Sequence, residues 1–305
     1  MRRRTFLGLT SSAVTGFGLF PDTLVAGKPA GISTAADLNR YLRSLIEVDE
    51  PSVDKVIVGD PDTRVRKIGT AWMPYWRTLK EASARGVNTM VVHEPTFYTH
   101  RDLEENQWDY HSAPSPGREI YLEQVAVKRK WIEDNRMVVI RCHDVLDKIG
   151  GYGIPFAFGR ALGFADSDIV RSRTYYNVYA IETRRAIDVA RHIAGKLSGA
   201  GQPGVAFYGD ADYPVKTVGL GTGCICDPIN YRDLDMDLAI AIDDTVNTWK
   251  QTTFAEDTGR PLLVVNHGTS EEFGMRELSG HLQRVVDDYE TIHFNQGCSY
   301  RWVTA

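Results

Sequence analysis

Three apolar segments of the sequence each run directly into residues of the types that bind metal ions. The residues that follow these segments, in chain order, are His93-Glu94, His143-Asp144 and Asn266-His267. In open parallel sheets, ligands bind beyond the carboxyl ends of the strands. Because neighbouring strands lie only about 5 Å apart, three such ends can converge on one point. The pattern therefore predicts one shared site at the edge of a sheet.

Two of these strand ends carry a carboxylate four residues further on. Asp147 follows His143, and Glu271 follows His267. On an opening helical turn this spacing puts both side chains on one face. Mixed nitrogen and oxygen donors suit zinc, manganese or iron better than copper or an iron-sulfur cluster. Each histidine taken alone is also typical of a hydrogen-bonded loop or cap residue, but the threefold repetition favours a metal site.

With His93 and Glu94 added, the candidate site has enough donors for two divalent ions. Two metals would lower the pKa of a bound water and stabilise the charge that develops on a substrate oxygen. We therefore expect a metal-dependent hydrolase in which Glu271 or Glu94 handles protons. Two alternatives stay open. A closed ligand shell would indicate a non-catalytic metal-binding or partner-binding scaffold, and Cys142 beside His143 could act as a nucleophile.

Strand-like and helix-like segments alternate through most of the chain, and they must position these residues. Strands are expected at 67–72, 88–93, 137–142, 174–181, 204–208, 215–220, 237–242 and 261–266. Helices are expected at 34–47, 76–85, 119–135, 155–162, 185–197, 245–254 and 268–288. The polar, aromatic segment 96–118 is expected to be a long loop over the surface or over a site. This alternation predicts an α/β fold with layers and largely parallel sheets.

Four motifs, in order and in spacing, resemble the NIF-three-like dinuclear-metal family, often named GTP cyclohydrolase I type II. The first is Val-Ile-Val-Gly-Asp-Pro at 56–61. Residues 91–97, Val-Val-His-Glu-Pro-Thr-Phe, resemble the family's His-His-Pro-x-Phe. Residues 143–147, His-Asp-Val-Leu-Asp, are similar to its His-Thr-Asn-Leu-Asp, and 266–271, Asn-His-Gly-Thr-Ser-Glu, to its Gly-His-x-x-Ser-Glu. The resemblance covers nearly all of the chain after the first 30 residues.

The resemblance implies a set of metal ligands. They fall on His93, Asp147, His267 and Glu271. Glu94 stands where a second histidine is usual, and His143 would contact the ligands or bind a metal only occasionally. Because a carboxylate is a harder, charged ligand, Glu94 could shift the preference towards manganese, iron or magnesium, or weaken one of the two sites.

Two further departures from the family concern the substrate. Ala241-Ile242-Asp243 stands in place of the family's Thr-Gly-Glu, and the acidic residue expected near Trp72 is missing. Substrate handling is therefore expected to have diverged. The class of substrate expected from the chemistry of the site is a small phosphorylated, nucleotide-like or amide compound.

The expected domain organisation has two α/β lobes. The first consists of residues 31–170 together with 260–305, and the second of residues 171–259. The metal site is expected where the early and late segments meet. The family resemblance also implies a closed ring of identical subunits, commonly a hexamer.

The N-terminus has the pattern of a twin-arginine export signal. Arg2, Arg3 and Arg4 precede Thr-Phe-Leu and a weakly apolar run that ends at Phe20. This run is too short and too polar to span a membrane stably. We expect a signal peptide at 1–27 and a periplasmic or otherwise exported protein. A basic tail on a cytosolic protein is the alternative.

Composition bounds the partners of the chain. The formal net charge is −5, and the sequence has no long basic run beyond its N-terminus. It thus lacks the electrostatic signature of a nucleic-acid-binding protein, and a small-molecule substrate is expected instead. The four cysteines form no dense disulfide pattern, so they are interpreted as packing residues or as one optional bridge.

Overall fold

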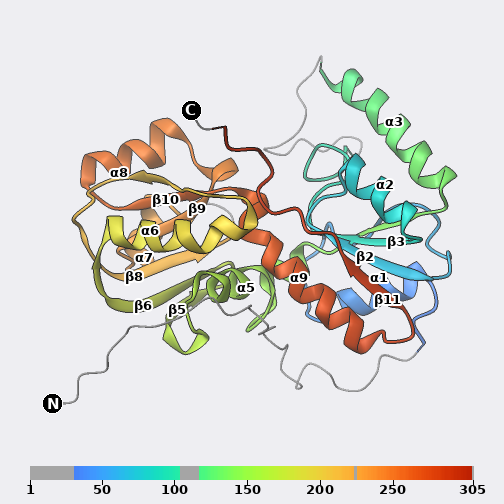
Figure 1. The fold of residues 1–305 in the computed structure, drawn as a ribbon, viewed down its shortest axis with the longest axis horizontal. Helices are drawn as coiled ribbons and strands as arrows, with labels where there is room; N and C mark the ends of the chain where they lie inside the picture. Colours follow the sequence, from blue (N-terminus) through green and yellow to red (C-terminus); the bar gives the residue numbers. More distant parts are fainter. Residues whose placement is uncertain (1–30, 104–116, 223–224, 304–305) are drawn as a thin grey trace.

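Two β-sheets, each covered by helices on both faces, make up the described part of the protein (Figure 1). The computed structural model describes residues 31–103, 117–222 and 225–303. The predicted signal peptide, most of the predicted loop 96–118 and Cys224 lie outside the described residues.

The first sheet has five strands. Their spatial order is β1 (Val56–Val58), β4 (Val138–Arg141), β3 (Thr89–Val92), β2 (Lys67–Ala71) and β11 (Glu290–His293). All neighbouring strands are parallel except β1, which is antiparallel to β4. The helices α1 (Ala35–Arg43) and α9 (His267–Val285) contribute to the core on one face, and α2 (Trp76–Ala84) and α3 (Arg118–Asp134) to the core on the other. Every residue of β3 and β4 is buried, as expected for apolar strands between two helical layers.

The second sheet has six strands. Their spatial order is β5 (Ile169–Arg173), β6 (Tyr176–Arg185), β8 (Pro214–Gly221), β9 (Leu238–Ile242), β10 (Leu262–Val265) and β7 (Ala206–Tyr208). The strands β8, β9 and β10 run parallel, and the outer strands are antiparallel to their neighbours. The helices α5 (Gly153–Leu162) and α6 (Ala186–Leu197) cover one face, and α7 (Pro228–Asp233) and α8 (Thr253–Thr258) the other.

Shorter helical segments connect these elements. They are α4 (Asp144–Lys148), η2 (Asp166–Asp168), η3 (Ser198–Ala200), η4 (Asp243–Thr245) and the π-helix η5 (Thr248–Thr252).

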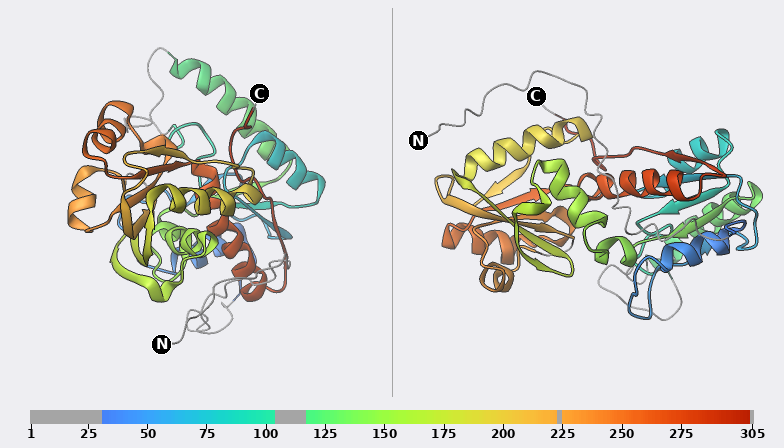
Figure 2. Two further views of the ribbon diagram at one scale, coloured as in Figure 1. Left: turned by 60° about the vertical axis from the view of Figure 1, so that its left-hand side comes forward. Right: turned by 90° about the horizontal axis from the view of Figure 1, so that it is seen from below.

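The helix α9 joins the two sheets. It begins directly after β10 of the second sheet, whereas its later residues Met275, Leu278 and Leu282 pack with α1 in the core of the first. Figures 1 and 2 show this helix running from one lobe of the molecule to the other. The buried carboxylate of Glu272 on α9 is hydrogen-bonded to His293 Nε2 at 2.6 Å and thereby holds β11. Side chains at the start of α9 consequently lie between the two sheets.

The predicted α/β class with mostly parallel strands is confirmed, and several details differ from the prediction. The strands β1, β5 and β11 were not predicted: β1 has only three residues, and β5 and β11 are polar and partly exposed, so no continuous apolar run marks them. The segment predicted as one helix at 245–254 forms η5 and then α8. The lobe boundaries as a whole stay a prediction, but β10, which was predicted in the first lobe, pairs with β9 and β7 in the second sheet.

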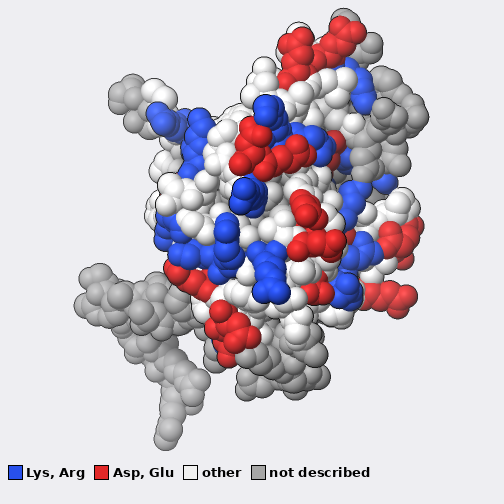
Figure 3. Space-filling model, turned by 90° about the vertical axis from the view of Figure 1, so that its right-hand side faces the viewer, with Lys and Arg blue, Asp and Glu red and all other residues white. Residues whose placement is uncertain are grey.

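The surface carries charges of both signs. On the face shown in Figure 3, Lys and Arg side chains are interspersed with Asp and Glu side chains. Among the helices in the described part of the chain, none combines the length and the apolar character that a membrane crossing requires.

The fold predicts a pH-dependent stability that is centred on His281. This side chain is fully buried on α9, and its Nε2 lies 2.6 Å from the hydroxyl of Tyr41. Burial, helped by the charge of Arg284, lowers the pKa of His281 from 6.5 to about 4. The unfolded chain therefore binds more protons between these two pH values, and the free energy of unfolding falls as the pH falls from 6.5 to 4. We expect this histidine to account for a loss of about 2 kcal/mol over that range.

Chemical denaturation at a series of pH values tests this expectation. His281→Gln should flatten the dependence of the unfolding free energy on pH between 6.5 and 4. The control variant His192→Gln changes an exposed histidine on α6 and should keep the slope of the wild-type protein. An unchanged slope in His281→Gln would contradict the assignment.

Candidate metal centre

The predicted ligands lie at strand ends that come from both sheets. His93 and Glu94 follow β3, and His143 follows β4, its parallel neighbour in the first sheet. His267 is the first residue of α9, directly after Asn266 and β10. The prediction that all three ends share one sheet edge was wrong for the third, because β10 pairs in the second sheet. Its carboxyl end meets those of β3 and β4 across a pocket that residues of both sheets line.

Two aspartates, the buried Asp54 and the half-buried Asp243, fix the two helices that carry the carboxylates of the site. The Asp54 carboxylate accepts hydrogen bonds from the backbone N–H groups of His143, Asp144 and Val145, at the start of α4. The Asp243 carboxylate accepts the backbone N–H of His267, 3.1 Å away, at the start of α9. Because free N–H groups at a helix N-terminus attract anions, each aspartate stabilises its helix and fixes the first turn.

One group of possible ligands combines His93, His143 and Asp147, whose ligand atoms lie within 4.8 Å of one another. His93 Nε2 lies 3.6 Å from Asp147 Oδ1, and His143 Nδ1 lies 3.5 Å from Asp147 Oδ2. The two imidazole rings are stacked, with centroids 4.5 Å apart. The other nitrogen of His93, Nδ1, lies 3.1 Å from the carbonyl oxygen of Cys142 and is hydrogen-bonded to it, which leaves Nε2 to face the carboxylates.

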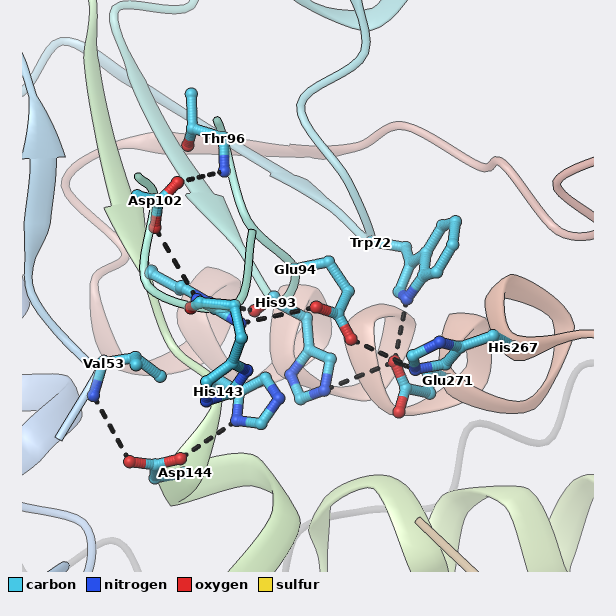
Figure 4. A network of polar contacts seen from close by, with 12 residues as sticks. Val53, Trp72, His93, Glu94, Thr96, Asp102, His143, Asp144, His267 and Glu271 are labelled. Carbon is cyan, nitrogen blue, oxygen red and sulfur yellow. Dashed lines mark hydrogen bonds and ion pairs between the residues drawn. The ribbon is translucent and has the colours of Figure 1, made fainter. Parts of the chain in front are cut away.

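A second group combines His93 with Glu94 and Glu271 and overlaps the first at His93 (Figure 4). Glu271 Oε2 lies 3.4 Å from His93 Nε2 and 3.0 Å from His267 Nε2. His267 Nε2 also lies 3.1 Å from Glu94 Oε1. Glu271 therefore lies between the two histidines, in the position from which one carboxylate can contact both halves of the site.

Close packing of Trp72 against the first turn of α9 holds Glu271 in this position. The Trp72 indole N–H donates to Glu271 Oε2 at 2.8 Å. Gly268 permits the approach, because a Cβ at this position would lie only 2.9 Å from the Trp72 ring and 2.7 Å from the carbonyl oxygen of Gly297. A side chain at position 268 would push the helix away from the indole, and Glu271 with it.

Arg141, at the end of β4, holds Glu94 and the loop that follows it. Its side chain is fully buried, and its Nε donates to the carbonyl oxygen of His93 at 3.0 Å. Its Nη2 lies 3.4 Å from Glu94 Oε2, and its Nη1 lies 3.6 Å from Asp102 Oδ2. The Asp102 carboxylate in turn accepts the backbone N–H groups of Thr96 and Phe97. The additional negative charge of Glu94 is thus balanced by a guanidinium that the fold keeps away from water.

The buried charges of the site shift one another's pKa values. Burial alone lowers the pKa of His93, but the negative charges of Glu271, Asp147 and Glu94 more than offset this and raise it to about 10. Burial raises the pKa of Glu271, but the positive charges of His267 and His93 outweigh it and bring the value to about 2. Burial dominates at Asp147, whose pKa rises to about 6. Protonated imidazoles thus supply, in the metal-free chain, the positive charge that these carboxylates require.

The site opens into a pocket of about 570 Å³. Its lining includes Trp72, Tyr98, His100, His143, Tyr175 and Tyr176 together with Glu94, Asp147, His267 and Glu271, whereas His93 is fully buried behind them. A centre of this kind has both a set of donors and space for a small molecule beside them. Such a space distinguishes an open metal site from a closed structural one.

Cys142 does not fit the role of a nucleophile. Its side chain is fully buried, and burial raises the pKa of its thiol well above the usual value. A thiolate is the reactive form, so this cysteine is held in its unreactive state. No disulfide joins Cys142, Cys226 and Cys298, the cysteines in the described part of the chain.

Four residues of the site were not predicted as functional from the sequence. They are Asp244, Trp72, Arg141 and His100. Asp244 Oδ2 lies 3.0 Å from His267 Nδ1 and orients that ring. Asp244 lies just beyond the end of β9, so the rule that singled out the other strand ends could have found it. His100 lines the pocket with its ring against that of His143, at a centroid distance of 5.2 Å.

Comparisons with known proteins bear on the fold. No protein-family model and no curated protein matches this chain. Solved structures do match. The Bacillus cereus protein related to NIF3 has a TM-score of 0.69 at 12% identity and covers 90% of this chain and 100% of its own. The Staphylococcus aureus hypothetical protein SA1388 has a TM-score of 0.67 at 17% identity, covering 89% and 99%. HcgD from Methanocaldococcus jannaschii has a TM-score of 0.61 at 16% identity, covering 85% and 97%.

The chain has the NIF3-like fold. The resemblance predicted from the four sequence motifs is thereby supported at the level of the fold. At these identities the comparison does not carry an activity from one protein to another. The chemistry of the site therefore has to follow from the residues of this chain.

The donor set of the NIF3-like chain fits a bound metal. His93 Nε2 and Asp147 Oδ1 are buried, and neither has a hydrogen-bond partner of acceptable geometry among the described residues. Buried polar atoms without partners are rare in native proteins and call for an unseen ion or water. A divalent cation between the two atoms would satisfy both.

We predict that the purified NIF3-like protein contains about two equivalents of a transition metal per chain, and that a His93→Ala, His267→Ala double variant contains none. The physical reason is that the double variant removes the imidazole from each half of the site. Elemental analysis of both proteins makes the measurement, and His192→Ala on the exposed face of α6 is the control. About one equivalent in the wild-type protein would mean that Glu94, in place of the usual histidine, has abolished one of the two metal sites. Absence of metal even after reconstitution would contradict the assignment.

Proposed function

We propose that this NIF3-like protein is a metal-dependent hydrolase of a small organic substrate. The observation that carries the proposal is the open pocket beside two overlapping ligand groups that share His93. A metal bound there would lower the pKa of a coordinated water and polarise the substrate bond to be broken.

The residues of the chain have distinct roles in this proposal. Glu271 is proposed as a ligand that contacts both histidines, because its Oε2 accepts the Trp72 N–H and lies between His93 and His267. Glu94 has one oxygen near His267 and the other near Arg141, and it is the better placed of the two glutamates to accept a proton from the attacking water. Arg141 keeps this carboxylate oriented, as a general base requires.

His143 is a second group that can move protons in the pocket. Its side chain is partly exposed, and its Nδ1 lies 3.0 Å from Asp144 Oδ1. The Asp144 carboxylate also accepts the hydroxyl of Ser52 at 2.9 Å, which fixes its orientation. An imidazole oriented by a carboxylate at the wall of a pocket suits proton transfer to a leaving group.

The alternative of a non-catalytic metal-binding scaffold is less well supported by the geometry. A structural site surrounds its metal with protein ligands on all sides. Here Glu94, Asp147, His267 and Glu271 line a pocket that has room for a small molecule.

We predict that the protein hydrolyses at least one compound in a panel of 4-nitroanilides, 4-nitrophenyl esters and 4-nitrophenyl phosphate. A chelator should abolish this hydrolysis, and added metal should restore it. Glu94→Gln should lower kcat by about 100-fold or more, because the variant loses a proton acceptor but keeps an oxygen donor. Metal content should be measured on the same samples. Glu119→Gln, on the exposed side of α3, is the matched control. Activity that persists in the metal-free protein would rule out the proposed role of the metal.

We also propose that the protein is exported through its twin-arginine signal and acts in the periplasm as a homo-oligomer, on a small molecule rather than on nucleic acid. The arginine run at positions 2–4 and the apolar run that follows support export. The mixed surface charges of Figure 3 agree with the absence of a nucleic-acid partner.

An Arg3→Lys, Arg4→Lys double variant should keep the protein in the cytoplasm, since this export route recognises the paired guanidinium groups. Fractionation of cells that express the wild-type and variant chains makes the measurement, with Lys28→Arg as the control. Equal export of both chains would refute the signal assignment.

A further inference from the structure

The pocket beside the metal centre has an unusual charge balance. Its described lining includes no lysine or arginine. The carboxylates that line it are Glu94, Asp144, Asp147, Asp244 and Glu271. Two divalent cations would carry four positive charges, one fewer than these five carboxylates. The pocket therefore has no surplus of positive charge even with both metals bound.

The cations that lie closest in the fold are already engaged. Arg141 is fully buried, and its guanidinium contacts Glu94 and Asp102. Lys148 Nζ lies 3.1 Å from the exposed Asp49 carboxylate and is hydrogen-bonded to Tyr175, so this lysine lies behind the pocket wall and is not part of the lining. The segments 104–116 and 223–224, which the structure does not describe, contain no lysine or arginine in the sequence.

The helix N-termini at the site are not available to an anion either. A phosphate group commonly binds to the free backbone N–H groups of such a terminus. At α4 three of these groups donate to Asp54, and at α9 the N–H of His267 donates to Asp243. The N–H of Thr269 on α9 donates to the side chain of Asn266. These backbone N–H groups thus already donate to side chains of the protein itself.

Aromatic rings form much of the remaining wall. Tyr98 and Tyr175 are 49% and 37% exposed, so both rings can contact a ligand. The ring of Tyr176 lies beside that of Tyr175, with centroids 6.4 Å apart, and Trp72 adds a further ring to the lining. Aromatic faces stack on planar groups and attract cations.

We propose that the pocket binds a small aromatic compound that carries a positive charge or none, with the cation preferred, and that it discriminates against phosphorylated compounds. The inference deepens the proposed hydrolase function. Only the statement that this compound is a substrate rests on that function, because binding can be measured without turnover. It narrows the sequence-based expectation by removing phosphorylated and nucleotide substrates.

Three probes with one benzyl group in common test the proposal on the full mature chain loaded with zinc. They are benzyltrimethylammonium, benzyl alcohol and benzyl phosphate. The quaternary ammonium has no lone pair, so it cannot bind through the metal. Titration calorimetry or ligand-observed NMR should show benzyltrimethylammonium binding most tightly and benzyl phosphate at least about tenfold more weakly.

Variants separate the wall of the pocket from the rest of the surface. Tyr98→Ala should weaken benzyltrimethylammonium by about threefold to tenfold. Tyr300→Ala removes a ring that is 46% exposed and lies outside the pocket, and it should have no effect. Tyr98→Lys, which adds the missing cation, should strengthen benzyl phosphate by about tenfold.

The possible outcomes distinguish this proposal from the hydrolase proposal. Benzyl phosphate binding as tightly as benzyltrimethylammonium would overturn the inference, and so would the absence of saturable benzyltrimethylammonium binding below about 50 mM. The predicted order of affinities without turnover of any ester, amide or phosphate would support the inference while the hydrolase proposal fails. Turnover of 4-nitrophenyl phosphate together with tight benzyl phosphate binding would support the hydrolase proposal and overturn the inference about the ligand.

Discussion

The position of the Glu271 carboxylate determines most of the geometry of the metal centre. This buried group must find positive partners, because an unpaired charge away from water is strongly destabilising. It has three polar neighbours: the Trp72 N–H at 2.8 Å, His267 at 3.0 Å and His93 at 3.4 Å. These neighbours come from different parts of the fold. Pairing one carboxylate therefore requires β2, β3 and the start of α9 to meet at one place.

The same electrostatic constraint explains the aspartates around the centre. Two helices begin at the site, and the N-terminus of each carries a partial positive charge. Asp54 and Asp243 neutralise these ends with hydrogen bonds to the first backbone N–H groups. The helices are thereby fixed in direction, which places Asp147 and Glu271 close to their N-terminal ends. A consequence is that the centre stays rich in negative charge, as suits a site for cations.

Glu94 shows how a departure from a family pattern can be compensated within one chain. A glutamate in the usual place of a histidine brings a negative charge into a buried site. Arg141 is fully buried 3.4 Å away and also contacts Asp102 and the carbonyl oxygen of His93. Removing one member of such a buried pair leaves the other charge uncompensated and typically costs about 3–5 kcal/mol. The guanidinium therefore stabilises Glu94 and the loop that follows it at the same time.

Local patterns in the sequence were sufficient for the layered α/β class and for most strands and helices. They were also sufficient to mark His93, Glu94, His143, Asp147, His267 and Glu271 as candidate ligands, because apolar runs mark buried strands and a spacing of four marks one helical face. That these side chains lie together is seen only in the tertiary structure. It placed β10 in the second sheet, so the centre forms between two sheets rather than along one edge. Contacts with residues far away in the sequence give Trp72, Arg141 and Asp244 their roles. Periodicity could not predict these contacts, because it indicates whether a side chain is buried and which way it faces but not which partner it will meet.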